Sequence, residues 1–160
     1  MFSRTADLFE LFGFRVRVDL SWLILAALVV WSLAMGYFPS VEPGLESATY
    51  WWMAIAGAIV LMFSLVFHEL SHSLVARAYG LPIGGSTLFV FGGVAEMESE
   101  PVSPKAEFLM AIAGPLASFL LAGIAWLLAG WGDGGALPVT VTAVLAYMAL
   151  LNFVLGAFNL

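Results

Sequence analysis

The sequence contains no cysteine and very few charged side chains. Without cysteine, these 160 residues can form neither disulfide bonds nor thiolate metal sites. Only 10% of the residues are charged and 62% are hydrophobic, whereas soluble domains carry roughly 25% charged residues. So few charges cannot cover a water-exposed surface. The sequence also contains no run of basic residues that would indicate a nucleic-acid partner. The composition therefore predicts an integral protein of the lipid bilayer.

Four apolar stretches are long enough to cross a bilayer, which takes about 20 helical residues. They lie at about 20–38, 51–79, 106–130 and 138–160. Two shorter stretches favour strands: 14–20 alternates polar and apolar residues, and 83–95 is apolar but interrupted by glycines. We therefore expect a membrane all-α fold, with four transmembrane helices and a small interfacial or re-entrant β element in one core domain.

The basic residues are distributed on one side of the expected membrane. Arg4, Arg15 and Arg17 precede the first span, Arg77 ends the second, and Lys105 opens the third. Because positively charged loops stay in the cytoplasm, this distribution predicts a multi-pass protein whose N-terminus is cytoplasmic.

The only two histidines, His68 and His72, frame Glu69 within the second span. Positions i and i+4 share one face of a helix, so both imidazoles can reach one metal ion. Glu69 is then placed to take a proton from a water bound there. A histidine pair that merely joins helices by hydrogen bonds would explain neither this spacing nor the position of the glutamate.

A catalytic zinc normally has three protein ligands, so two histidines leave the set incomplete. The acidic residues available downstream are Glu96, Glu98, Glu100, Glu107 and Asp133. The alternating glutamates before Pro101 are more simply interpreted as a solvated charged face. Asp133 falls on the opposite side of the membrane from the basic residues. We therefore expect the third ligand to lie outside these candidates.

Further motifs follow in a fixed order. They are Phe-Gly-Gly-Val-Ala at 91–95, prolines at 101 and 104, Glu-Phe at 107–108, Ala-Gly-Pro at 113–115 with Ser118, and Phe-Asn-Leu at 158–160. Together with His-Glu-x-x-His, they make the chain resemble the site-2 proteases, which are intramembrane zinc metalloproteases. The resemblance covers essentially the whole chain and is greatest to prokaryotic members, which implies the prokaryotic cell membrane.

This resemblance implies that one zinc ion is held by His68 and His72, with Glu69 as the catalytic base and Asn159 holding the substrate or its oxyanion. The family's third ligand is an aspartate, which would fall beyond Leu160. The protease core is therefore expected to be incomplete at its C-terminus, and inactive as written. The implied function is hydrolysis of peptide bonds in transmembrane substrates near the cytoplasmic face, as in regulated intramembrane proteolysis.

Two other functions stay open. A non-catalytic homologue would bind metal and hold membrane partners without cleaving them. A divalent-metal transporter is a weaker alternative, because such proteins typically carry another acid after the second histidine, where this chain has Ser73. Within the protease hypothesis, the strand Thr87–Phe91 could pair with an unwound substrate as an added strand.

Overall fold

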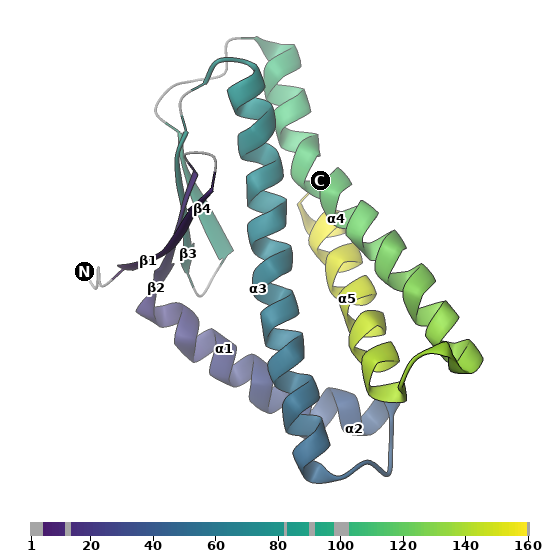
Figure 1. Ribbon diagram of the computed structural model, residues 1–160. Coiled ribbons are helices and arrows are strands. Elements are labelled where there is room, and N and C mark those ends of the chain that lie inside the picture. The colour runs from purple at the N-terminus through teal and green to yellow at the C-terminus, as the bar shows by residue number, and fades with distance from the viewer. Residues whose placement is uncertain (1–4, 12–13, 82, 90–91, 98–102, 160) are drawn as a thin grey trace.

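The computed structural model describes residues 5–11, 14–81, 83–89, 92–97 and 103–159. The order of elements is β1, β2, α1, α2, α3, β3, β4, α4 and α5, with π-helical turns after α1 and α4. Figure 1 shows the long helix α3 at the centre, with the sheet and α1 on one side and α4 and α5 on the other.

The helices account for the four apolar stretches. Helix α1 (Leu20–Ser32) continues through the π-helical turn Leu33–Tyr37 into the short α2 (Phe38–Val41), and the others are α3 (Ser47–Ala78), α4 (Pro104–Trp131) and α5 (Val139–Phe158). Within the residues that the structure describes, four helical segments, beginning at 21, 47, 104 and 139, are long and apolar enough to span a membrane. The predicted fold class is confirmed, and the protein is an integral multi-pass membrane protein.

Local signals fix where two of these helices begin. Asp19 caps α1, because its carboxylate accepts a hydrogen bond from the backbone N–H of Ser21 at 2.9 Å. Hydrogen bonds from Ser21 also lower the pKa of Asp19 below its ordinary value. Ser103 caps α4 by accepting from the N–H of Ala106, and Pro104 occupies the first helical position, where no N–H is needed.

The β element is a four-stranded sheet in the order β1-β2-β3-β4. Strands β1 (Thr5–Leu11) and β2 (Phe14–Asp19) pair antiparallel, as do β3 (Ile83–Phe89) and β4 (Gly92–Met97). The two hairpins are joined by the parallel pairing of β2 with β3. Strand β1 was not predicted. Thr87 and Leu88 of β3 are paired with β2 on one side and β4 on the other, so an added substrate strand cannot pair there. Residues 90 and 91 of the proposed pairing segment lie outside the described residues, and the outer edges of the described sheet belong to β1 and β4.

Packing between the helices depends on small and polar residues, while large apolar side chains face outward. At Gly57 on α3, an added Cβ would lie 2.7 Å from a methyl group of Leu33 and 3.3 Å from the ring of Tyr147, so neighbouring segments approach closely there. Ser64, Ser118 and Asn152, on α3, α4 and α5, are fully buried, whereas Trp126 and Phe153 are more than half exposed. This is the distribution expected of helices whose outer surfaces face lipid.

Candidate metal centre

The two histidines lie one turn apart on α3 and converge. Their Nε2 atoms are 3.1 Å apart, and the ring centroids are 4.8 Å apart at an interplanar angle of 72°. Two nitrogen ligands of one tetrahedral zinc, each about 2.0–2.1 Å from the metal, lie about 3.3 Å apart. The observed separation is therefore close to that of two histidines sharing one ion.

The opposite nitrogen of each ring is bound by α4. His72 Nδ1 lies 2.6 Å from the carbonyl oxygen of Met110, and His68 Nδ1 lies 2.9 Å from Ser118 Oγ. A carbonyl only accepts hydrogen bonds, so His72 must donate from Nδ1, which leaves a lone pair on Nε2. Metal-binding histidines commonly have such outer partners, which fix the tautomer and the orientation of the ring.

Gly114 provides the space in front of both imidazoles. A Cβ built at this position would contact His72 Nε2 and lie 2.6 Å from His68 Nε2. Any side chain here would therefore occupy the point on which the two nitrogens converge. The adjacent Pro115 has no N–H to give to the preceding turn of α4. The paired donor atoms and the open space at Gly114 together fit a small cation.

Glu69 follows His68 directly and is therefore turned about 100° around α3 from it. Its side chain is partly buried, and within the described part of the chain its carboxylate makes no hydrogen bond or ion pair. Its backbone carbonyl accepts a hydrogen bond from Ser73 Oγ at 3.0 Å. A carboxylate that has no hydrogen bond or ion pair within the described residues, next to the histidine pair, is available for proton transfer.

In the described part of the chain, no hydrogen bond joins Asn159 to either histidine. It lies at the C-terminal cap of α5, exposed, and its Nδ2 donates to the carbonyl oxygen of Leu155 at 2.7 Å. Its predicted role in substrate binding therefore depends on how α5 is positioned against α3.

The third metal ligand is not found among the residues that the structure describes, where no group of three or more histidine, aspartate or glutamate side chains could hold a metal. Glu107 is exposed in the first turn of α4, and Asp133 is exposed just beyond the other end of that helix. Glu98, Glu100 and the side chain of Glu96 lie outside the described part of the chain. An aspartate beyond Leu160 stays a prediction.

Three contributors to the site were not assigned a role from the sequence. The carbonyl of Met110 carries no side-chain signal, and Ser118 was noted only as part of a motif. The third is Asn152 on α5, whose Nδ2 donates to Ser64 Oγ, 2.8 Å away and one turn before His68 on α3. A polar residue in the middle of an apolar span was the available signal, because such residues usually have a specific partner.

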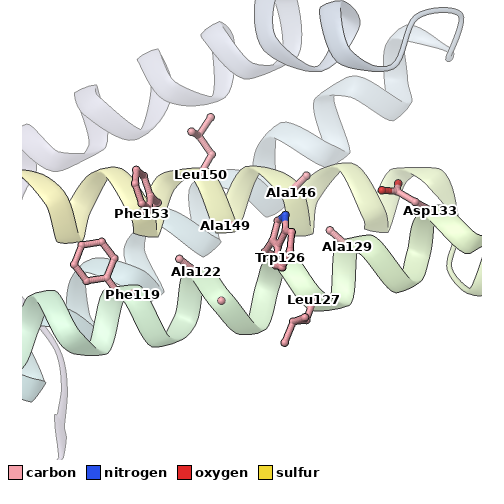
Figure 2. Close-up of a pocket in the computed structure, with 12 residues that line it drawn as sticks. Phe119, Ala122, Trp126, Leu127, Ala129, Asp133, Ala146, Ala149, Leu150 and Phe153 are labelled. Atoms are coloured by element: carbon pink, nitrogen blue, oxygen red, sulfur yellow. The ribbon is translucent and has the colours of Figure 1, made fainter.

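A groove of about 920 Å³ lies away from this centre, between α4 and α5. Figure 2 shows Phe119 and Phe153 toward one end and Asp133 toward the other. Its lining is almost entirely apolar and includes neither histidine nor Glu69. Asp133 is the one carboxylate among the lining residues, and a single carboxylate does not make a metal site, so the histidine pair is the candidate site.

The chain is similar to a known protein family and to zinc metalloproteases of other organisms. Residues 56–134 match the model of peptidase family M50. Over 148 residues, 92% of this chain and 37% of the relative, the chain is 39% identical to Rip3 of Mycobacterium tuberculosis, whose name describes a zinc metalloprotease. Over 152 residues it is 38% identical to the similarly named sll0528 of Synechocystis, covering 94% of this chain and 38% of that protein.

The fold also matches a solved structure, that of the site-2 protease from Methanocaldococcus jannaschii. The TM-score is 0.66 at 25% sequence identity, and the match covers 96% of this chain and 63% of the solved chain. The chain thus spans less than two fifths of the length of Rip3 and sll0528 and almost two thirds of the solved structure.

Proposed function

We propose that this chain, as a member of peptidase family M50, the site-2 protease family, forms the metal-binding core of an intramembrane zinc metalloendopeptidase. The observation that carries this proposal is the convergence of His68 Nε2 and His72 Nε2, 3.1 Å apart, in front of Gly114. We take the metal to be zinc, because the names of Rip3 and sll0528 describe zinc metalloproteases.

In this proposal His68 and His72 hold the ion, and their outer partners on α4 keep both lone pairs directed at it. Zinc, when bound, supplies Lewis acidity toward the scissile carbonyl and the attacking water. Glu69 is the general base that removes a proton from that water and afterwards returns it to the leaving amine. The free carboxylate of Glu69 supports this role.

The proposed substrates are transmembrane proteins, cleaved within the bilayer near its cytoplasmic face. His68 lies ten residues before the end of α3 at Ala78, or roughly 15 Å along the helix. With the basic residues in the cytoplasm and the N-terminus inside, this end of α3 faces the cytoplasm. The site then lies inside the membrane, where water and ionisable groups are rare and usually functional.

Two parts of the proposal concern residues at or beyond the end of the printed chain. One zinc ion would take its third protein ligand from an aspartate beyond Leu160, which completes the usual set of three. Asn159 would bind the substrate backbone or its oxyanion through its side-chain amide, which can donate two hydrogen bonds.

The test is a comparison of Glu69→Gln with Glu107→Gln in zinc-loaded protein that continues beyond Leu160 through the proposed aspartate ligand, using a labelled transmembrane peptide in vesicles as the substrate. Glutamine cannot accept the proton, so Glu69→Gln should lower the cleavage rate by about 100-fold or more while zinc binding is kept. Glu107 is an exposed glutamate at the start of α4, and its variant should cleave like the wild type.

Each alternative function makes a different prediction in this experiment. A non-catalytic homologue would bind zinc, but the wild type would cleave no more than Glu69→Gln. A transporter would instead take up zinc into vesicles, and uptake would be lost in His68→Ala. Either result would contradict the protease proposal.

A further inference from the structure

Asn152 is a fully buried amide in the middle of the apolar helix α5. Its Nδ2 donates to Ser64 Oγ on α3 at 2.8 Å and to the carbonyl oxygen of Met148 in its own helix at 2.9 Å. Its Oδ1 is buried and has no partner among the described residues. Within the described residues the amide of Asn152 therefore acts only as a donor, and its bond to Ser64 joins α5 to α3.

This bond lies close to the metal centre along α3. Ser64 precedes His68 by one helical turn and is itself fully buried, so the two residues lie near the same face of the helix. The bond therefore fixes the position of α5 along the axis of α3 at a point one turn before His68.

The same bond determines which residue near the end of α5 lies level with the histidine pair on α3. Figure 1 shows α3 and α5 running in the same direction. Seven residues advance each helix by about 10.5 Å and rotate it by only about 20°. Counting seven residues from Ser64 gives Ser71, and counting seven from Asn152 gives Asn159. The bond between Asn152 and Ser64 thus places Asn159 level with Ser71 along the axis of α3. Ser71 is the residue immediately before His72.

We propose that Asn152 is a positioning residue: its bond to Ser64 sets the register of α5 on α3 and thereby holds Asn159 at the height of the histidine pair. This inference rests on the proposed function only in that Asn159 is there the substrate-binding residue.

A directional bond is suited to this task in a way that apolar packing is not. Sliding α5 by the rise of two residues moves the donor about 3 Å along α3, which lengthens the 2.8 Å hydrogen bond to about 4 Å and breaks it, whereas an apolar contact can form again with a neighbouring side chain.

Cysteine cross-linking measures this register directly, because the chain has no native cysteine. In zinc-loaded protein in vesicles, Ser71→Cys with Asn159→Cys is compared with Val75→Cys with Asn159→Cys, using a short bifunctional thiol reagent. Val75 lies one turn beyond Ser71 on a similar face of α3. The proposal predicts that the 71–159 pair cross-links at least about threefold faster than the 75–159 pair.

Asn152→Ala should bring this ratio close to one. Thr142→Val is the matched control, because Thr142 is also buried on α5 but its hydroxyl bonds only to Pro138 of the same chain segment; it should leave the ratio unchanged. Exchanging the partners, Ser64→Asn with Asn152→Ser, restores a donor and an acceptor across the interface and should restore the preference.

Zinc affinity, measured by competition with a chromogenic chelator, separates positioning from general damage. Asn152→Ala should bind zinc within about threefold of the wild type, because the histidines are oriented by α4. An unchanged cross-linking ratio in Asn152→Ala would overturn the proposal. A variant that lost both the cross-linking preference and zinc binding would also overturn it, because this would indicate general damage to the structure. Neither readout requires peptide cleavage, so the proposed protease function can fail without affecting this result.

Discussion

Replacing Gly114 by alanine should abolish metal binding while leaving the helix that carries it intact. The added Cβ would lie 2.6 Å from His68 Nε2 and closer still to His72 Nε2, whereas ordinary van der Waals contact begins at 3.4 Å. His68 Nε2 would have to retreat by about 0.8 Å, and metal–ligand distances are held within about 0.2 Å. Such a movement of either imidazole would displace the Nε2 lone pair from its present direction.

We therefore expect Gly114→Ala to weaken zinc binding by at least about 100-fold, which is the upper end of what loss of an outer partner alone produces. The measurement is competition for zinc against a chromogenic chelator in detergent. Gly123→Ala on the same helix is the matched control, because no atom lies within 4 Å of its added Cβ; it should bind zinc within about twofold of the wild type.

Alanine is a better helix former than glycine by roughly 0.5–1 kcal/mol, so neither substitution should weaken α4 itself. Thermal unfolding of both variants checks this. If Gly114→Ala bound zinc within threefold of the wild type, the ion could not lie where the two Nε2 atoms converge, and the reasoning from the glycine would be refuted.

Two further predictions concern the hydrogen bonds around the site and the start of the bundle. Ser118→Ala removes the Nδ1 partner of His68 and should weaken zinc binding by about 10- to 100-fold in the same chelator assay. Ser73→Ala is the control and should have little effect, because Ser73 is a buried serine whose hydroxyl donates to a carbonyl within α3. Asp19→Ala removes the cap of α1 and should lower the thermal midpoint at neutral pH. Because the folded pKa of Asp19 is lowered below 3.8, the difference from the wild type should be full above about pH 5 and should shrink as the pH falls through the folded pKa; a difference that grew in acid would contradict this.

The helices could be predicted from the sequence because a membrane span depends on length and apolarity alone. The strand pattern at 14–20 was also visible, since every second residue is charged. Strand β1 (Thr5–Leu11) was missed because Asp-Leu-Phe-Glu-Leu does not alternate cleanly, and its register with β2 shifts between Asp7 and Phe9. The parallel pairing of β2 with β3 joins segments separated by α1, α2 and α3, so no local pattern could indicate it.

The histidine pair was predictable for the same reason as the spans: its signal, two ligands at i and i+4, is local. The residues that orient it are not local. Ser118 lies 50 positions from His68, and the Met110 carbonyl belongs to the backbone, which no sequence pattern distinguishes. The bond from Asn152 to Ser64 joins residues 88 positions apart. The sequence contains these residues, but only the packing of three helices brings them together.

The metal content of the purified protein tests the central claim most directly. In protein that continues beyond Leu160 through the proposed aspartate ligand, elemental mass spectrometry should find close to one zinc per chain in the wild type and almost none in the double variant His68→Ala with His72→Ala. Glu69→Gln should stay near one, since Glu69 acts on protons and not as a ligand. Equal zinc in the wild type and the double variant would show that the ion is held elsewhere and would contradict the account of this site.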